Sequence, residues 1–281
     1  MNIVAHEAPD EFQNRSIGPN MKIDSDVFPP GVQPPKVVDM ERMALLLDVD
    51  GTLLDIAATP NSVVVSPCLL TTLCKLIQLC DGALALVSGR TIASLDRLFA
   101  PAQTAAVGGH GVELRFSGDS PVLKRFAIPL STRLRHELHQ LVATDRRLFI
   151  EDKNYAIAVH YRLAREREPF LRDEIAEAVR RADTDSLEIL AGKAVLEVKS
   201  RHVSKGLAVS ELLAAQAFAG RIPLFIGDDI TDESVFAVLP DFGGYGYSVG
   251  RLIRGACGTL SSPREVRSWL ASLAGGSEQA P

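Results

Sequence analysis

The sequence predicts an α/β protein in which a smaller α+β unit interrupts a core built on a parallel sheet. Two observations support this. In the first and last parts of the chain, short apolar runs typical of strands buried on both faces alternate with helical patterns. In the middle, two helical patterns and two pairs of adjacent strands indicate an α+β unit. We expect residues 41–114 and 200–281 to form the core and residues 115–199 to form the inserted unit.

Local patterns place the strands and helices of the core. Ala44–Leu47 is a continuous apolar run that suits a buried strand. A helix should begin at Ser66-Pro67, because serine is a favoured N-cap and proline is tolerated at the first helical position. The other core elements are expected as strands at 83–87, 105–107, 222–226 and 245–249, and as helices at 91–99, 204–218, 231–239 and 263–273.

The inserted unit should contain two helices and a sheet made of two hairpins. Apolar spacing predicts helices around residues 134–142 and 170–179. The hairpins are expected to turn at Lys153-Asn154 and at Gly192-Lys193. Because successive side chains of a strand point to opposite faces, one face of this sheet should be apolar. The other face should present polar groups, namely His160, Arg162, Glu197 and Lys199.

Composition excludes several classes of function. The net charge of the 281 residues is −5 and the pI is about 5.7, which gives no electrostatic sign of nucleic-acid binding. No apolar stretch is long enough to span a bilayer, and the N-terminus lacks the pattern of a signal peptide. The four cysteines have no zinc-binding spacing and suit buried free thiols in a reducing cytoplasm. We expect a cytoplasmic protein with a small-molecule partner and no membrane partner; the oligomeric state stays open.

The first 40 residues differ from the rest of the chain. They contain six prolines and show little hydrophobic periodicity. Such a segment cannot bury enough apolar surface to fold by itself. We expect residues 1–40 to form a mobile extension and assign them no function.

Asp48 and Asp50 follow the first predicted strand, in the segment Asp48-Val49-Asp50-Gly51-Thr52. Open α/β sheets bind ligands at the carboxyl ends of their strands. Two carboxylates placed there can act separately, one as nucleophile and one as acid and base. An ordinary Asp-Gly turn is the alternative, and the segment alone favours function only moderately.

A second acidic segment, Gly227–Glu233, also follows a predicted buried strand. Asp228, Asp229 and Asp232 lie so close in sequence that their charges call for a cation or raised pKa values. Clustered carboxylate oxygens suit Mg²⁺. Acidic residues at a helix N-terminus would explain Asp232 and Glu233, but explain Asp228 and Asp229 poorly.

Two weaker signals complete the set. Ser88-Gly89-Arg90 lies between a strand and a helix, where a hydroxyl and free amides can hold a phosphoryl oxygen. Lys205 lies in the first turn of a helix, where the helix dipole disfavours a cation unless an anion is near. A capping serine and an exposed lysine are the alternatives, and each alone is the simpler explanation. The combination of four signals in order, each at a strand end or helix start, favours function.

In this order the four motifs resemble those of the haloacid-dehalogenase superfamily, over about residues 44 to 250. The resemblance implies a Rossmann-like core with a mobile cap inserted after the third core strand. Within the superfamily, the chain is most similar to the trehalose-6-phosphate phosphatases. The segments that carry this similarity are Gly108–Glu113, Asn154 with His160–Arg162, Gly192-Lys193 with Leu196–Lys199, and Gly227–Glu233.

The resemblance also implies roles for the motif residues. Asp48 would be the nucleophile that becomes an aspartyl phosphate, and Asp50 the acid and base. Thr52, Ser88 and Lys205 would hold the phosphoryl oxygens. Mg²⁺ would be held by Asp48, the carbonyl of Asp50 and Asp228, with Asp229 or Asp232 orienting a bound water.

The cap should select the sugar. Its polar face supplies hydroxyl-binding groups, and for Glu197 and Lys199 the strand alternation and the resemblance agree. For His160 and Arg162, a solvated sheet face is equally consistent. His110 also suits a structural position near the hinge. The full set of substrate-binding candidates is Arg90, His110, Glu113, Asn154, His160, Arg162, Lys193, Glu197 and Lys199.

Three other functions fit the same motifs. The protein could hydrolyse another sugar phosphate, such as sucrose 6-phosphate, because related enzymes share the core. A sugar-phosphate sensor without catalysis is a second alternative, although all the partners of Asp48 are present. A phosphotransferase that passes the phosphoryl group to a second sugar is the third.

Overall fold

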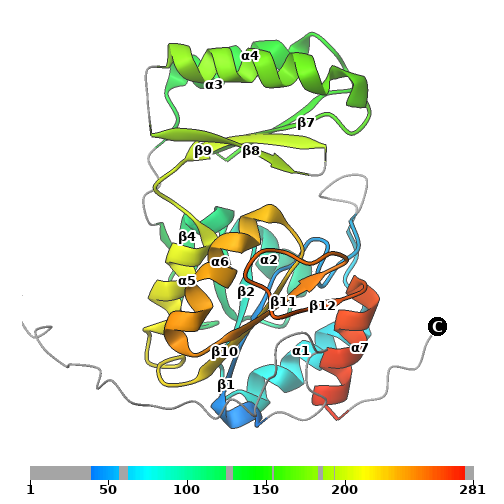
Figure 1. The fold of residues 1–281 in the computed structure, drawn as a ribbon, viewed down its shortest axis with the longest axis vertical. Helices are drawn as coiled ribbons and strands as arrows, with labels where there is room; N and C mark the ends of the chain where they lie inside the picture. The colour runs from blue at the N-terminus through cyan, green and yellow to red at the C-terminus, as the bar shows by residue number, and fades with distance from the viewer. Residues whose placement is uncertain are drawn as a thin grey trace, which may run out of the picture.

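The computed structural model describes residues 39–56, 63–124, 129–153, 155–182, 186–192 and 194–275. Almost all of the extension expected at residues 1–40 therefore lies outside the described residues, as do Asn154 and Lys193. The described part divides into a large α/β core and a smaller unit above it, which we call the cap (Figure 1).

The core is built on an eight-stranded sheet in the order β12-β11-β10-β1-β2-β3-β4-β5. The first six strands are parallel, and β4 and β5 add antiparallel pairs at one edge. The central strand β1 (Met43–Leu47) is completely buried, as its continuous apolar run predicts. The other strands are β2 (Leu84–Val87), β3 (Ala105–Gly108), β4 (Glu113–Arg115), β5 (Leu123–Lys124), β10 (Ile222–Gly227), β11 (Tyr245–Val249) and β12 (Gly258–Leu260).

Helices cover both faces of this sheet (Figure 1). Helix α5 (Lys205–Leu213) packs against α6 (Glu233–Val238), and α1 (Pro67–Leu79) packs against α7 (Pro263–Leu273). Helix α2 (Ile92–Phe99) connects β2 to β3. The predicted start of α1 is confirmed: the Ser66 hydroxyl accepts a hydrogen bond from the amide of Leu69, and Pro67 is the first helical residue. Short 3-10 turns occur at Met40–Arg42, Gly109–Gly111, Arg165–Arg167, Ile230–Asp232 and Leu239–Phe242.

The cap is a four-stranded antiparallel sheet covered on one face by two helices (Figure 1). Ile157, Val159, Leu196 and Val198 pack against α3 (Thr132–Ala143) and α4 (Glu168–Arg181). The predicted apolar face is thereby confirmed, and the polar face points toward the core. The strands lie in the order β6 (Phe149–Asp152), β7 (Ala156–His160), β9 (Val195–Ser200) and β8 (Leu187–Gly192).

The structure departs from the expected elements and boundaries in several places. Strands β4, β5 and β12 were not expected, and β5 carries the core sheet beyond residue 114, where the core was expected to stop. Helix α5 ends at Leu213, not at Phe218. Tight turns replace the helix there: the amides of Ala215 and Phe218 each donate a hydrogen bond to the carbonyl three residues earlier. Phe218 is nevertheless buried, which explains why the apolar pattern continued.

Two further observations bear on the class of protein. No helix among the described residues combines the length and apolarity that a bilayer crossing requires. The four cysteines are free thiols, but only Cys80 is buried: Cys74 and Cys257 are partly exposed and Cys68 is exposed, so the expectation of buried thiols is wrong for these three.

Candidate active site

Asp48 and Asp228 lie side by side because the strands that precede them are neighbours. Asp48 follows β1 and Asp228 follows β10, and the two strands run parallel. The amide of Asp48 donates to the carbonyl of Ile226 at 2.9 Å, which fixes the first residue beyond the strand. Both carboxylates are buried. The two acidic segments therefore meet at one edge of the sheet.

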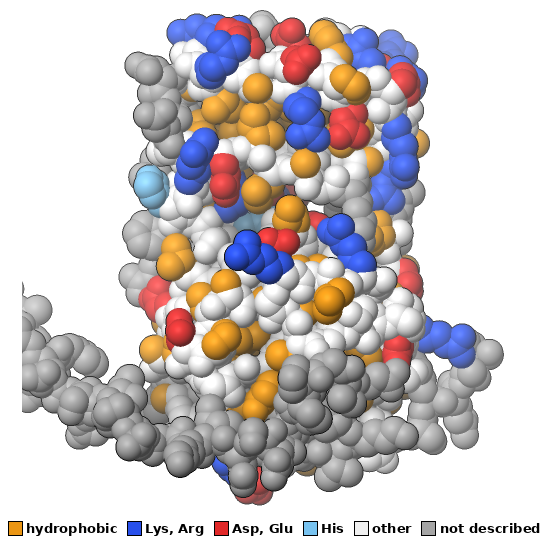
Figure 2. All heavy atoms as spheres, viewed as in Figure 1, with side chains coloured by type: hydrophobic (Ala, Val, Ile, Leu, Met, Phe, Trp, Pro, Cys, Tyr) orange, Lys and Arg blue, Asp and Glu red, His pale blue; other side chains and the backbone are white. Residues whose placement is uncertain are grey.

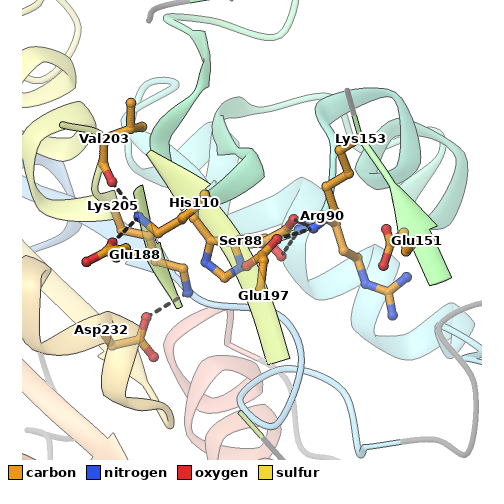
Figure 3. Close-up of polar contacts among 12 residues, drawn as sticks. Ser88, Arg90, His110, Glu151, Lys153, Glu188, Glu197, Val203, Lys205 and Asp232 are labelled. Atoms are coloured by element: carbon orange, nitrogen blue, oxygen red, sulfur yellow. Dashed lines mark hydrogen bonds and ion pairs between the residues drawn. The ribbon is translucent and has the colours of Figure 1, made fainter. Parts of the chain in front are cut away.

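Lys205 joins the acidic residues. Its ammonium nitrogen Nζ lies 2.8 Å from Asp48 Oδ1 and 2.7 Å from Asp232 Oδ1, and all three side chains are buried. Figure 3 shows the lysine extending from the start of α5 to Asp232. Burial lowers the pKa of Lys205, but Asp232 and Asp48 outweigh it, so its pKa lies above the ordinary value. The lysine therefore stays protonated, and two carboxylates offset its unfavourable position at the N-terminus of α5.

Carboxylates outnumber the positive charge at this point. Oxygens of Asp48, Asp228 and Asp232 all lie within 4.8 Å of one another. Burial raises the pKa of Asp48 well above its ordinary value; Lys205 acts against this, and Asp232 and Asp228 add to it. A buried cluster with one ammonium group and three acids is short of positive charge. Its donor set is all oxygen, which fits a hard divalent cation.

Asp232 is distinguished by its hydrogen bonds, which involve both of its carboxylate oxygens. Its Oδ2 accepts hydrogen bonds from the amides of Asp228 and Asp229, at 2.9 and 3.0 Å, while its Oδ1 accepts from Lys205. Asp229 caps the turn that follows, accepting from the amide of Ile230 at 2.8 Å. We infer that Asp232 shapes the loop, which leaves Asp48 and Asp228 as the better direct ligands.

Thr52 and Ser88 contribute buried hydroxyl groups close to strand ends: Thr52 on the loop after β1, and Ser88 directly after β2. Thr52 is completely buried, and its Oγ1 has no hydrogen-bond partner among the residues that the structure describes. Ser88 is also buried, and its Oγ accepts a hydrogen bond from the amide of Arg90 at 3.1 Å. The O–H of Ser88 can still donate a hydrogen bond to another acceptor. Both groups suit donation to an anion held in the site.

Arg90 contacts the second aspartate of the first motif. Its Nε and Nη2 donate to the two carboxylate oxygens of Asp50, at 2.6 and 2.7 Å. Such a two-bond pair fixes both the position and the plane of a carboxylate. Arg90 was expected to bind substrate; the structure places its guanidinium group on Asp50, at the wall of the cavity described below.

On the cap side, Glu197 is the centre of a buried charge cluster. Its Oε2 lies 2.8 Å from His110 Nε2 of the core, and its Oε1 lies 3.0 Å from Lys153 Nζ of the cap (Figure 3). Lys153 also donates to the carbonyl of Gly89 at 2.9 Å. Burial raises the pKa of Glu197, but His110 and Lys153 outweigh it, so its pKa lies well below the ordinary value. Glu197 is therefore a carboxylate held between cap and core.

The polar side chains enclose one cavity of about 590 Å³ between cap and core. In Figure 2 the hollow lies between the upper and lower parts of the molecule, with basic and hydrophobic side chains around it. The structure brings many of the expected site residues to its wall: Asp48, Asp50, Ser88, Arg90, His110, His160, Arg162, Glu197, Lys205, Asp228 and Asp229.

Glu113 and Lys199, two of the expected sugar-binding residues, are not on the cavity wall as the described residues form it. Glu113 is buried and accepts a hydrogen bond from the amide of Ile92 at 2.7 Å, at the start of α2. Lys199 is buried, lies 3.0 Å from Glu188 and donates to the carbonyl of Val203. The geometry gives both residues contacts that hold the structure together.

Among the cavity residues that were absent from the expected set are Glu151 and Lys153. Glu151 lies opposite Ala158 on β7, and Ala158 lies opposite Glu197 on β9, so these three residues share the polar face of the cap sheet. Extending the strand alternation through β6 would have found Glu151. Lys153 was assigned to a turn, and its contact with Gly89 depends on tertiary structure that the sequence pattern does not contain.

Comparisons with known proteins agree with this geometry. A family model described as trehalose-phosphatase matches residues 46–254. The chain is 40% identical over 238 residues to a probable trehalose-phosphate phosphatase of Sinorhizobium fredii, covering 84% of this chain and 89% of that protein. It is 35% identical over 229 residues to the trehalose-6-phosphate phosphatase of Escherichia coli, covering 82% and 85%.

A solved structure shows the same fold. The C-terminal domain of the Candida albicans trehalose-6-phosphate phosphatase superposes with a TM-score of 0.75 at 24% identity, covering 89% of this chain and 99% of that one. The loop after β1 that carries Asp48, the acidic loop after β10 and the cap all fall within the segment that the family model matches. The chain belongs to the trehalose-phosphatase family, whose fold is that of the haloacid-dehalogenase superfamily.

Proposed function

We propose that the protein hydrolyses trehalose 6-phosphate to trehalose and inorganic phosphate, the last step of trehalose synthesis. The observation that carries the proposal is one continuous cavity with Asp48, Lys205 and Ser88 on its core side and a polar cap face opposite. Such a cavity can hold a phosphoryl group at one side and sugar hydroxyls at the other. The names of the relatives in S. fredii and E. coli support the same substrate.

The residues supply a two-step transfer. A carboxylate oxygen of Asp48 attacks phosphorus, the bond between phosphorus and the sugar oxygen breaks, and Asp50 gives its proton to that oxygen. Asp50 then takes a proton from water, whose oxygen attacks phosphorus; phosphate leaves and the Asp48 carboxylate is restored. In the described state both oxygens of Asp50 accept hydrogen bonds from Arg90, so Asp50 must open this pair and take up a proton before it acts as the acid. Lys205, Ser88 and Thr52 hold the phosphoryl oxygens as their charge shifts.

Mg²⁺ is the metal that we propose for the acidic cluster. Asp48, Asp228 and the carbonyl of Asp50 would hold it, with Asp229 or Asp232 orienting bound water. When bound, Mg²⁺ supplies positive charge that offsets repulsion between a carboxylate nucleophile and a phosphate dianion. The clustering of three buried carboxylates supports this assignment, because a nearby cation favours their ionised forms.

The cap face binds the sugar in this proposal. Glu151, Glu197 and His160 offer hydrogen-bond acceptors and donors to hydroxyl groups, and all three line the cavity. His160 Nε2 lies 3.4 Å from Glu151 Oε2, so the two residues form one polar patch. Ala158, between Glu151 and Glu197 in the strand register, leaves room above the sheet. We also propose a cytoplasmic location, which the free cysteines favour.

A phosphate-release assay with trehalose 6-phosphate, sucrose 6-phosphate and glucose 6-phosphate, each with and without Mg²⁺, tests the proposal. We expect the highest kcat/KM on trehalose 6-phosphate and loss of turnover after chelation. Asp48→Asn should lower turnover to background while its unfolding transition remains, with Asp81→Asn at an exposed turn as control. Equal rates on the three sugars would reject the substrate, and retained turnover in Asp48→Asn would reject the mechanism.

A further inference from the structure

The cavity-facing side of strand β6 carries a charged residue, Glu151, and then an aromatic one, Phe149; His160, opposite Phe149, also lines the cavity. Lys153, just beyond the end of β6, contacts the core at Gly89, and Glu151 lies two residues before it. Phe149 lies on the same face, two residues before Glu151, and is paired with His160 of β7. At about 3.3 Å per residue, Phe149 is about 13 Å along the strand from the anchored lysine.

Large apolar side chains, Phe149 among them, line this cavity although solvent reaches them. Phe149 is 55% exposed, Leu163 is 74% exposed, and Ile56 of the core is 41% exposed. All three line the cavity that contains Asp48. Single exposed apolar residues are common on protein surfaces, but several that face one cavity indicate a surface that a ligand covers.

The Phe149 ring has a defined orientation. Its centroid lies 5.7 Å from that of the His160 ring, and the two planes are tilted by 45°. An aromatic ring held in a fixed orientation presents its negative face to the weakly positive C–H groups of a pyranose ring. Glu151 and Glu197, with Ala158 between them, form a polar row that suits hydroxyl groups. The Phe149 end of the sheet suits the apolar face of a sugar.

We propose that Phe149, together with Leu163, forms the platform for the glucose ring that carries no phosphate, and that this contact selects disaccharide phosphates over monosaccharide phosphates. The inference rests on the proposed function, since the phosphate-bearing ring must lie near Asp48. That ring occupies the polar row, and the second ring lies farther along β6. A glucose 6-phosphate molecule would fill the polar row alone and leave Phe149 uncovered.

The test compares Phe149→Ala with wild type on trehalose 6-phosphate and glucose 6-phosphate. We expect kcat/KM for trehalose 6-phosphate to fall by about tenfold or more, mainly through KM, since an aromatic contact of this size is removed. The value for glucose 6-phosphate should change by less than about twofold. Phe149→Trp should restore most of the loss, because it keeps an aromatic face.

Phe170→Ala is the matched control: Phe170 is an exposed aromatic residue of the cap, on α4 and away from the cavity wall. It should leave both substrates unchanged. Equal losses on both substrates in Phe149→Ala, or no loss on either, would overturn the platform. A change in oligomeric state of Phe149→Ala, with both kcat/KM values unchanged, would instead show that a second protein copy covers Phe149, which also overturns it.

A second measurement separates this inference from the proposed function. Trehalose should inhibit hydrolysis of p-nitrophenyl phosphate by the wild type more strongly than glucose does, and Phe149→Ala should lose that difference. If trehalose 6-phosphate is not hydrolysed, the proposed function fails, yet this inhibition still reports on the platform. If wild type and Phe149→Ala respond alike to trehalose and glucose, the platform fails while the proposed function can hold.

Discussion

At the scale of single residues, the acidic cluster depends on the absence of a side chain at Gly51. This glycine has a φ of +91°, and a Cβ atom placed there would lie 2.1 Å from Asp228 Oδ2. The loop after β1 and the Asp228 carboxylate can approach each other only because nothing stands between them. The Asp-Gly pair that resembled an ordinary turn is thus part of the candidate metal site.

Gly51→Ala should therefore abolish most turnover by displacing Asp228. Gly82→Ala is the control, because Gly82 has a similar φ of +81° but a Cβ there would contact nothing within 4 Å. Both variants should lose about 1–2 kcal/mol of unfolding free energy to backbone strain, measured by urea denaturation. Phosphate release should separate them: Gly82→Ala is expected to keep wild-type kcat, and similar activities in both variants would contradict the prediction.

Residue types near strand ends predicted the acidic cluster, but not every contact within it. Asp48 and Asp228 could be placed together because local patterns show where each strand ends, and parallel strands end at one edge. The bond between Arg90 and Asp50 joins residues 40 positions apart, and the contact of Lys153 with Gly89 joins residues 64 positions apart. Such pairs depend on tertiary distances, which no local pattern encodes.

At the scale of elements, long periodic segments were predictable and short ones were not. Helices α1, α3 and α4 each show an apolar stripe over three or more turns, and their positions agree with expectation. Strands β4, β5 and β12 contain only two or three residues each, too few for a pattern. They form because neighbouring strands offer unpaired edges.

Core and cap have separate hydrophobic centres, which gives a prediction at this scale. Leu138 of α3 belongs to the cap cluster and Leu73 of α1 to the core cluster, and both are completely buried. Leu138→Ala should cost about 2–5 kcal/mol and raise hydrogen exchange within the cap, with little change in β1 and β10. Leu73→Ala should show the reverse pattern. Equal increases throughout the molecule in either variant would indicate a single cooperative unit.

At the scale of the whole molecule, the cap lies closed on the core through a few specific contacts. Lys153 donates to Gly89 of the core, and Glu197 faces His110. A small apolar cluster of Val112, Tyr155, Ala156 and Val203 joins the two parts at their junction. These contacts join cap and core beside the cavity, and we expect them to carry much of the closure.

Lys153→Met should therefore open the cap, because it removes the bond to Gly89 and leaves Glu197 with His110 alone. Small-angle X-ray scattering without substrate should give a larger radius of gyration than for wild type, and kcat/KM for trehalose 6-phosphate should fall about tenfold or more. Hydrolysis of p-nitrophenyl phosphate, which needs only the core, should change little. Lys75→Met, at an exposed position on α1, should match wild type in both measurements. An unchanged radius with equal losses on both substrates would show that Lys153 acts at the core site and does not close the cap.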